Sequence, residues 1–236
     1  LYTGDLGLVS AGAFVKLLDG PIARTRVPLN NQGAERIQSI NGERAEIYGL
    51  ELAGNYRFTR LPDALRALRP FGVYATYSFA RTEARYDLGD VERRLGFIDT
   101  PEHTGNLALT YDNARSGTQL TLSGNYRGAR LNEIGVDERT DDYYRDETSL
   151  DFSAAQRLLR GAELFVEANN LLDTPERRTL GDPRGDAWRF RFRETYGRTL
   201  TAGVRYTYGR RVARRPSARL AVRTGHAPAP VAREAT

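Results

Sequence analysis

Apolar and polar residues alternate with a period of two through most of this chain, as in β-strands that have one apolar and one polar face. In 199–208, for example, Leu200 and Val204 fall on one face, and Thr201 and Arg205 fall on the other. The alternation recurs in eight segments, which are 8–17, 48–58, 71–79, 106–111, 119–127, 149–158, 161–169 and 199–208. The pattern predicts an all-β fold of eight strands with almost no helix.

The connections between these segments alternate in length. Long connections cover 18–44, 80–101, 128–147 and 173–194, and shorter ones cover 59–70, 112–117 and 159–161. Transmembrane β-barrels have this arrangement, with short periplasmic turns at one rim and long extracellular loops at the other. A soluble sandwich has no reason to sort its connections in this way. The sequence therefore predicts a transmembrane antiparallel β-barrel, or a part of one.

The two faces of the strands agree with this prediction. One face carries Leu, Val, Ala, Phe and Tyr, which suit lipid, and the other carries Glu, Arg, Asn, Gln and Thr, which suit a wet lumen. Aromatic residues such as Tyr48, Phe79, Tyr126 and Tyr206 fall near strand ends on the apolar face, as in the aromatic girdles of membrane interfaces. The alternative is that these aromatics fill the core of a soluble barrel or sandwich.

Composition excludes several classes of function. The chain of 236 residues has a formal charge of +5, but residues 209–236 carry seven Arg and one Glu, so the other 208 residues sum to −1. The body therefore lacks the basic surface of a nucleic-acid-binding domain, and no nucleic-acid partner is expected. Because the chain has no Cys and only two His, disulfides, thiolate catalysis and Cys-type zinc sites are excluded.

Four motifs occur in an order and spacing that resemble one family. These are Asn41-Gly42-Glu43-Arg44-Ala45-Glu46-Ile47-Tyr48-Gly49-Leu50-Glu51-Leu52, Pro101-Glu102-His103-Thr104-Gly105-Asn106, Phe165-Val166-Glu167-Ala168-Asn169-Asn170-Leu171-Leu172-Asp173 and Tyr196-Gly197-Arg198-Thr199-Leu200-Thr201-Ala202-Gly203-Val204-Arg205-Tyr206. Together they resemble strands in the last third of TonB-dependent outer-membrane receptors, over about residues 1–208.

The resemblance implies a barrel of about 22 strands around a plug, of which this chain would supply the last eight. We expect the plug and the TonB box to lie upstream of Leu1. The implied function is energised uptake of a scarce nutrient, such as a ferric siderophore or a similar iron complex, across the outer membrane of a Gram-negative cell. The implied partners are the TonB system, outer-membrane lipid and an extracellular small ligand. No enzymatic activity, catalytic residue, resident metal or cofactor is expected.

Other interpretations stay open at this point. The eight strands could close by themselves as a small outer-membrane barrel that serves as an adhesin, a structural protein or a lipid-modifying enzyme, and a soluble β-rich binding module is a third class. His103 lies at a strand start with only Glu102 to orient it, so a surface histidine is favoured over a catalytic one. The acidic pairs Asp137-Glu138 and Asp141-Asp142 are interpreted as a solvated loop rather than a calcium or iron site.

We divide the chain into a barrel portion, 1–208, and a tail, 209–236. The tail is rich in Arg, Pro and Ala and has no apolar periodicity, so we expect it to be disordered. Members of the family usually end on an aromatic residue of the last strand, so a tail after Tyr208 departs from their pattern.

The candidate ligand-binding residues are Arg189, Arg191 and Arg193. They alternate with Phe190 and Phe192 in apparent register with the closing strand, and this parity would place all three guanidinium groups on one wall of the extracellular vestibule. Guanidinium binds carboxylate and phosphate oxygens in a bidentate manner, which would suit an anionic chelate. The alternative is an exposed hairpin in which these arginines pair with Asp182, Asp186 and Glu194.

Overall fold

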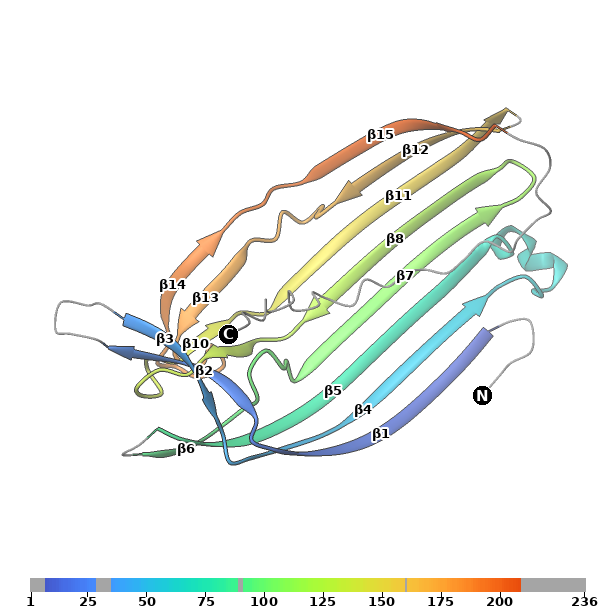
Figure 1. Ribbon diagram of the computed structural model, residues 1–236. Helices are drawn as coiled ribbons and strands as arrows, with labels where there is room; N and C mark the ends of the chain where they lie inside the picture. The colour runs from blue at the N-terminus through green and yellow to red at the C-terminus, as the bar shows by residue number, and fades with distance from the viewer. Residues whose placement is uncertain (1–6, 29–34, 89–90, 160, 209–236) are drawn as a thin grey trace, which may run out of the picture. The chain divides into compact units, whose positions relative to one another are not determined.

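A computed structural model describes residues 7–28, 35–88, 91–159 and 161–208 (Figure 1). The chain divides into a compact unit, Leu1–Tyr206, and a second unit, Thr207–Thr236. The predicted tail, 209–236, lies outside the described residues, and its disorder stays a prediction. In the described part of the chain, no helix is long and apolar enough to span a membrane.

Eight strands form one continuous antiparallel sheet, in which each strand pairs with the next one along the path (Figure 1). In spatial order they are β1 (Gly7–Asp19), β4 (Arg44–Arg57), β5 (Phe71–Asp87), β7 (His103–Asn113), β8 (Thr118–Arg127), β11 (Glu147–Leu159), β12 (Ala162–Asn169) and β15 (Thr199–Tyr206). All eight predicted strands are confirmed, and most extend past their predicted ends.

The sheet is open. β1 and β15 lie at the two ends of the strand order, and within the described residues they do not pair with each other. In the part of the chain that the structure describes, each end strand therefore pairs with another strand of this sheet on one side only. The unit Leu1–Tyr206 is thus a portion of a barrel wall and not a closed cylinder.

Strand register confirms the two predicted faces. Residues directly opposite in an antiparallel pair share a face, and Thr76 pairs with Asn106, which pairs with Asn125. On the other face, Leu109 pairs with Leu122, and Leu164 pairs with Val204. Val204 is 65% exposed and Leu52 is 50% exposed, so this broad apolar face has no protein cover in the described unit. Such a face requires lipid or another apolar partner.

The connections are sorted as predicted, with long ones at one end of the sheet and short ones at the other (Figure 1). At the short-connection end, Gly117 and Gly161 take φ values of +74° and +86°, a backbone conformation that only glycine adopts without strain. A 3₁₀ helix, η2 (Asp63–Leu68), lies in the β4–β5 connection.

The long connections contain seven shorter strands, of which six were not predicted. They are β2 (Ile22–Pro28), β3 (Glu35–Asn41), β6 (Glu92–Leu95), β9 (Arg130–Glu133), β10 (Asp142–Tyr144), β13 (Glu176–Leu180) and β14 (Arg189–Glu194). β6 extends the main sheet beside β5, and β9, β10, β13 and β14 form a second sheet. β2 pairs with β3, and the Arg26 backbone N–H of β2 donates to the carbonyl oxygen of Ile134, the residue after β9, at 2.9 Å.

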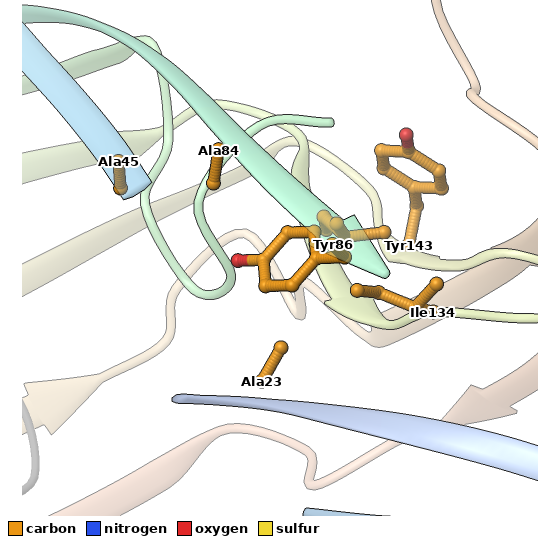
Figure 2. Close-up of a cluster of buried hydrophobic side chains, with 7 residues drawn as sticks. Ala23, Ala45, Ala84, Tyr86, Ile134 and Tyr143 are labelled. Atoms are coloured by element: carbon orange, nitrogen blue, oxygen red, sulfur yellow. The ribbon is translucent and has the colours of Figure 1, made fainter. Parts of the chain in front are cut away.

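A small hydrophobic core joins these loop strands to the ends of the long strands (Figure 2). Tyr86, at the end of β5, is fully buried, and Ile134 beside it is equally buried. The other buried members are Ala23, Ala45, Ala84, Leu131 and Tyr143. Ala45 pairs with Ala84 and has the parity of the polar face. The long connections therefore fold back over the polar face at this end of the sheet.

Candidate functional site

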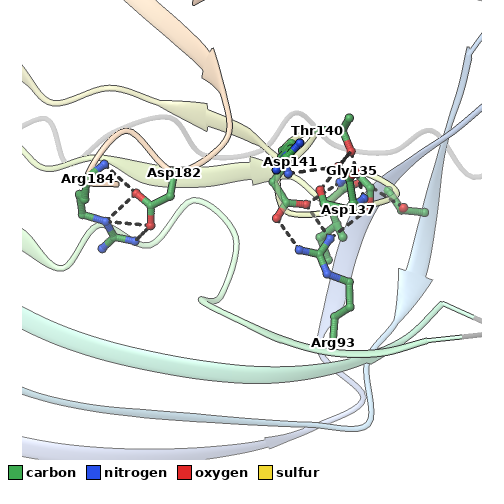
Figure 3. Close-up of polar contacts among 10 residues, drawn as sticks. Arg93, Gly135, Asp137, Thr140, Asp141, Asp182 and Arg184 are labelled. Atoms are coloured by element: carbon green, nitrogen blue, oxygen red, sulfur yellow. Dashed lines mark hydrogen bonds and ion pairs between the residues drawn. The ribbon is translucent and has the colours of Figure 1, made fainter. Parts of the chain in front are cut away.

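Two adjacent aspartates anchor the long connections through buried ion pairs. Asp141, just before β10, receives two hydrogen bonds from the Arg93 guanidinium of β6, at 2.8 and 2.7 Å (Figure 3). The backbone N–H of Gly135 donates a third at 2.8 Å. Burial raises the pKa of the Asp141 carboxyl, even though Arg93 acts in the opposite direction. The interaction ties the β5–β6 hairpin to the connection between β9 and β10.

Asp142 is the centre of a second network and is fully buried. Its carboxylate is ion-paired with Arg178 of β13 and lies 3.0 Å from Nη1 of Arg191. Asn132 of β9 donates a hydrogen bond from Nδ2 at 2.8 Å. Burial, together with neighbouring cations such as Arg26, lowers the pKa of Arg191 against the opposing effect of Asp142. Arg26 itself is ion-paired with Glu133, so β2 is also attached to this network.

The interpretation of Asp141 and Asp142 as part of a solvated acidic loop was wrong. Both carboxylates are buried, because arginines from distant segments surround them. Asp137 and Glu138 are exposed, as that interpretation requires. Among the described residues, no group of three His, Asp or Glu side chains is arranged to hold a metal ion.

A polar pocket of about 360 Å³ lies at the same end of the sheet. Its lining includes Thr82, Phe97, Glu102, Arg130, Tyr143 and Arg184. Arg130 and Arg184 each have an acidic partner. Arg130 donates a hydrogen bond to Asp99 at 2.8 Å, and Arg184 is ion-paired with Asp182 at 2.6 Å. The pocket therefore offers hydrogen-bonding groups and two aromatic rings, and two of its three arginines have acidic partners.

The structure separates the three predicted ligand-binding arginines. The register of β13 and β14 shifts between Arg178 and Thr179, so Arg193 pairs with Arg177 and Arg189 pairs with Leu180. This bulge places Arg189 and Arg193 on opposite faces of β14. Only Arg191 joins the Asp142 network. The prediction that these arginines continue the register of the closing strand was wrong, because Gly197, with φ +76°, lies between β14 and β15.

The predicted alternative partners of these arginines are engaged elsewhere or lie apart from them. Asp182 binds Arg184, and the carboxylate of Glu194 accepts a hydrogen bond from the Tyr196 hydroxyl at 3.0 Å. Among the described residues, no ion pair involves Asp186. The carboxylates that bind Arg191, those of Asp142 and Glu133, come from more than 40 residues upstream, and no local pattern indicated them.

His103 occupies the apolar face at the start of β7. Its ring stacks on Tyr77, with 6.0 Å between centroids, and its Nδ1 lies 2.8 Å from the Tyr77 hydroxyl. Phe79 packs against the same ring at 5.3 Å. His103 is therefore part of an aromatic group on the apolar face of the sheet.

Comparisons with known proteins agree on the fold. Residues 2–171 match the family model described as TonB dependent receptor-like, beta-barrel. No curated protein matches the chain.

Solved structures of transporters are similar over most of this chain. The ferric citrate transporter FecA, in its unliganded form, is 15% identical over 86% of this chain and 29% of its own, with a TM-score of 0.59. The copper transporter OprC is 20% identical over 88% of this chain and 30% of its own, with a TM-score of 0.58. The FrpB iron transporter from Neisseria meningitidis (F3-3 variant) is 13% identical over 87% of this chain and 30% of its own, with a TM-score of 0.55. At these identities the likeness shows the fold alone, and the chain spans less than a third of each of these proteins.

Proposed function

The chain belongs to the TonB-dependent receptor β-barrel family, and from this premise we propose that it forms the C-terminal part of an outer-membrane receptor for energised nutrient uptake. The observation that carries the proposal is the open antiparallel sheet with one apolar and one polar face and all its long connections at one end. The apolar face would contact outer-membrane lipid, and the polar face would line the lumen. TonB would act on a segment upstream of Leu1. Such a receptor moves its ligand without making or breaking a bond, so we propose no enzymatic activity.

We propose that the ligand is a ferric siderophore or a similar iron complex. Two of the three similar structures are iron transporters, and the third transports copper. Copper(I) favours thiolate and thioether ligands, but this chain has neither Cys nor Met. Its imidazole in β7 is held in the aromatic group on the apolar face. The long connections instead offer guanidinium, hydroxyl and carboxylate groups, which suit a polar chelate.

The alternative of a self-contained eight-stranded barrel fits the structure less well. Such a barrel needs its first and last strands to pair, and among the described residues β1 and β15 do not pair with each other. An open sheet of eight strands suits a part of the larger barrel of the family.

Arg189 and Arg193 stay proposed contacts for an anionic group of the ligand. Both are exposed, and no ion pair of either is found in the described part of the chain. Arg191 is held by Asp142 and would serve to position β14. Separate substitution of each of the three by Gln in the full-length receptor, followed by ligand binding to whole cells, would distinguish these roles.

The uptake proposal is tested in cells that express the full-length receptor. We expect binding and import of radiolabelled ferric citrate or ferric siderophores, with import abolished by deletion of TonB and binding retained. A protonophore should have the same effect, since it removes the energy source. Import that persists without TonB, or binding that is no greater than in cells without the receptor, would contradict the proposal.

A further inference from the structure

Three arginines occupy neighbouring positions across the second sheet. Register pairs Arg177 of β13 with Arg193 of β14. On the other side of Arg177, the backbone N–H of Arg145, the residue after β10, donates to the Arg177 carbonyl oxygen at 2.9 Å. Residues opposite each other on adjacent strands point to the same face. Arg145, Arg177 and Arg193 therefore form one row on one face, which we call the arginine row.

Among the described residues, one carboxylate approaches the arginine row. Oδ1 of Asp146 lies 4.0 Å from Nε of Arg145, at the outer limit of an ion pair. Arg177 donates from Nη2 to the backbone oxygen of Asp146 at 3.2 Å. Among the described residues, neither Arg177 nor Arg193 takes part in an ion pair. Like charges directly opposite each other destabilise a sheet, so this row calls for a counterion.

The Nε atoms of Arg145 and Arg177 are both buried, and neither has a hydrogen-bond partner. A buried N–H donor without an acceptor is unfavourable, and two of them in one row indicate a shared missing acceptor.

Arg178, one position along from Arg177 on the opposite face, has the carboxylate partner that Arg177 lacks among the described residues. It is ion-paired with Asp142 and donates hydrogen bonds to this carboxylate. Glu176 and Glu194 pair with each other one position beyond Arg177 and Arg193. Because side chains alternate along a strand, these two carboxylates point away from the arginine row.

The row is both ordered and accessible. The Arg145 guanidinium lies over the Trp188 ring, 4.8 Å from its centroid, which limits its conformational freedom. Arg193, at the other end, is exposed. A ligand could therefore enter at Arg193 and reach the less exposed groups beside it.

We propose that the arginine row binds an oxyanion, a ligand with phosphate or carboxylate groups. Guanidinium donors match the paired oxygens of these groups, and adjacent arginines could share one ligand. The source is either a soluble anion or the phosphate of a lipid headgroup. The site deepens the proposed function, because an anionic nutrient would be a suitable ligand, but oxyanion binding can be measured without any uptake.

The test uses the purified full-length receptor in a non-ionic detergent, with inorganic phosphate and citrate as probes. We expect saturable binding in calorimetry and a rise in the thermal midpoint with either anion. The double variant Arg177→Gln, Arg193→Gln should bind about tenfold or more weakly, because charge-assisted hydrogen bonds are lost. The control Arg115→Gln removes an exposed charge at the short-connection end and should leave binding unchanged.

A second readout separates lost binding from lost folding. In buffer without multivalent anions, the double variant should be at least as stable as the parent, because it removes a repulsive pair. The proposal would be overturned if the double variant were less stable than the parent in this buffer. It would also be overturned if Arg115→Gln weakened anion binding as much as the double variant does. Absence of saturable binding by the parent in detergent and in vesicles would also overturn it.

Reconstitution identifies the source of the oxyanion. In phosphatidylcholine vesicles, the parent should respond to phosphate as it does in detergent. The alternative result is that phosphatidylglycerol in the vesicles removes the response of the parent, so that the parent and the double variant respond alike to added phosphate. That result confirms the site with a lipid headgroup as its ligand. A response that persists in both kinds of vesicle confirms it with a soluble anion as its ligand.

Discussion

Arg93 and Arg94 are sequence neighbours with opposite surroundings. The Arg93 side chain is 9% exposed and binds Asp141, whereas the Arg94 side chain is 60% exposed and only approaches Glu83 and Glu92, at 3.8 and 4.0 Å. Removal of one member of a buried pair leaves an unpaired charge and costs about 3–5 kcal/mol. We expect Arg93→Leu to destabilise the β9–β10 connection by this amount.

The measurement is the rate of protease cleavage within residues 136–139 of the full-length receptor, which follows the population of the open connection when closing is fast. Arg93→Leu should raise this rate more than about a hundredfold. Arg94→Leu is the matched control and should change it less than about fivefold, since exposed pairs contribute about 0–1 kcal/mol. Equal rates in the two variants would show that the buried pair does not hold the connection.

Asp182 gives a prediction for pH dependence. Burial acts to raise the pKa of its carboxyl, but hydrogen bonds from Arg184 prevail and hold the pKa below the ordinary value of 3.8. A carboxyl whose folded pKa is depressed stabilises the fold above its unfolded pKa and loses this contribution as pH falls through the folded pKa. The Asp182–Arg184 turn should therefore stay closed down to pH 3.8 and open at lower pH.

Trp188, the only tryptophan of this chain, reports on this turn, because its Cα is within 3.2 Å of where a Cβ at Gly181 would lie. The fluorescence difference between the parent and Trp188→Phe should change below pH 3.8 and not between pH 5 and 7. Asp182→Asn should show no such acid transition. A transition centred above pH 5 would argue against the depressed pKa.

The contacts of single residues were less predictable from the sequence than the strands or the fold. The sequence singled out Asp141 and Asp142 as a pair, but their partners Arg93 and Arg178 lie 48 and 36 residues away. Such pairs depend on how the long connections fold over the sheet, and nothing in a local window specifies this. The parity of Arg189, Arg191 and Arg193 was also misleading, because a single bulge changes which face each residue occupies.

The two faces of the long strands lead to a prediction at the scale of elements. The chain has no cysteine of its own, so single cysteines can be introduced without a background. In cells that express the full-length receptor, cysteines at Glu51, Asn125 and Glu163 should react with a water-soluble thiol reagent. Cysteines at Leu52, Leu122 and Val204 should react far more slowly, because lipid shields them. The reverse pattern would mean that the faces are exchanged.

Close approach at Gly49 makes the β4–β5 pairing sensitive to one methyl group. A Cβ at this position would lie 2.1 Å from the Phe79 carbonyl oxygen and 2.9 Å from the Phe14 ring, so the backbone must move. We expect Gly49→Ala to destabilise the receptor by about 1–3 kcal/mol. Gly124→Ala is the control, because its nearest neighbour, the Ser149 carbonyl oxygen, would be 3.8 Å away.

Thermal unfolding of the two glycine variants in detergent, followed by loss of heat-modifiable migration on a gel, gives the comparison. A midpoint for Gly49→Ala equal to that of Gly124→Ala would show that β4 and β5 accommodate the methyl group.

The long strands were predictable because eight segments keep one period over six or more residues, with an apolar face and a polar face. The short strands of the long connections lack this signal. β9 and β10 are four and three residues long and almost entirely buried on both faces, so their polar residues Asn132, Glu133 and Asp142 do not alternate with apolar ones. Their strand character comes from the pairing of β10 with β9 and β13, which no short segment encodes by itself.

For the whole molecule, the open edges of β1 and β15 predict that residues 1–208 do not form a monomeric barrel alone. Each edge is a row of backbone groups that lipid cannot hydrate. Expressed without the rest of the receptor, this segment should aggregate or pair with other copies. Light scattering coupled to size-exclusion chromatography in detergent measures its mass, and a folded monomer would instead support the self-contained barrel.

Shared anchoring of the long connections bears on how this receptor could be re-engineered or diversify. The β5–β6 hairpin, β2 and β9–β10 meet in one small core (Figure 2). Buried ion pairs also join Arg93 of β6 to Asp141 (Figure 3), Arg178 of β13 to Asp142 and Arg26 of β2 to Glu133, so each connection supplies a partner that another one needs. A chimera that takes a single connection from a related receptor would leave one of these arginines or carboxylates without its partner. Ligand preference should therefore be transferable only when these connections are exchanged as a set, and natural recombination should favour breakpoints in the long strands over breakpoints between one connection and the next.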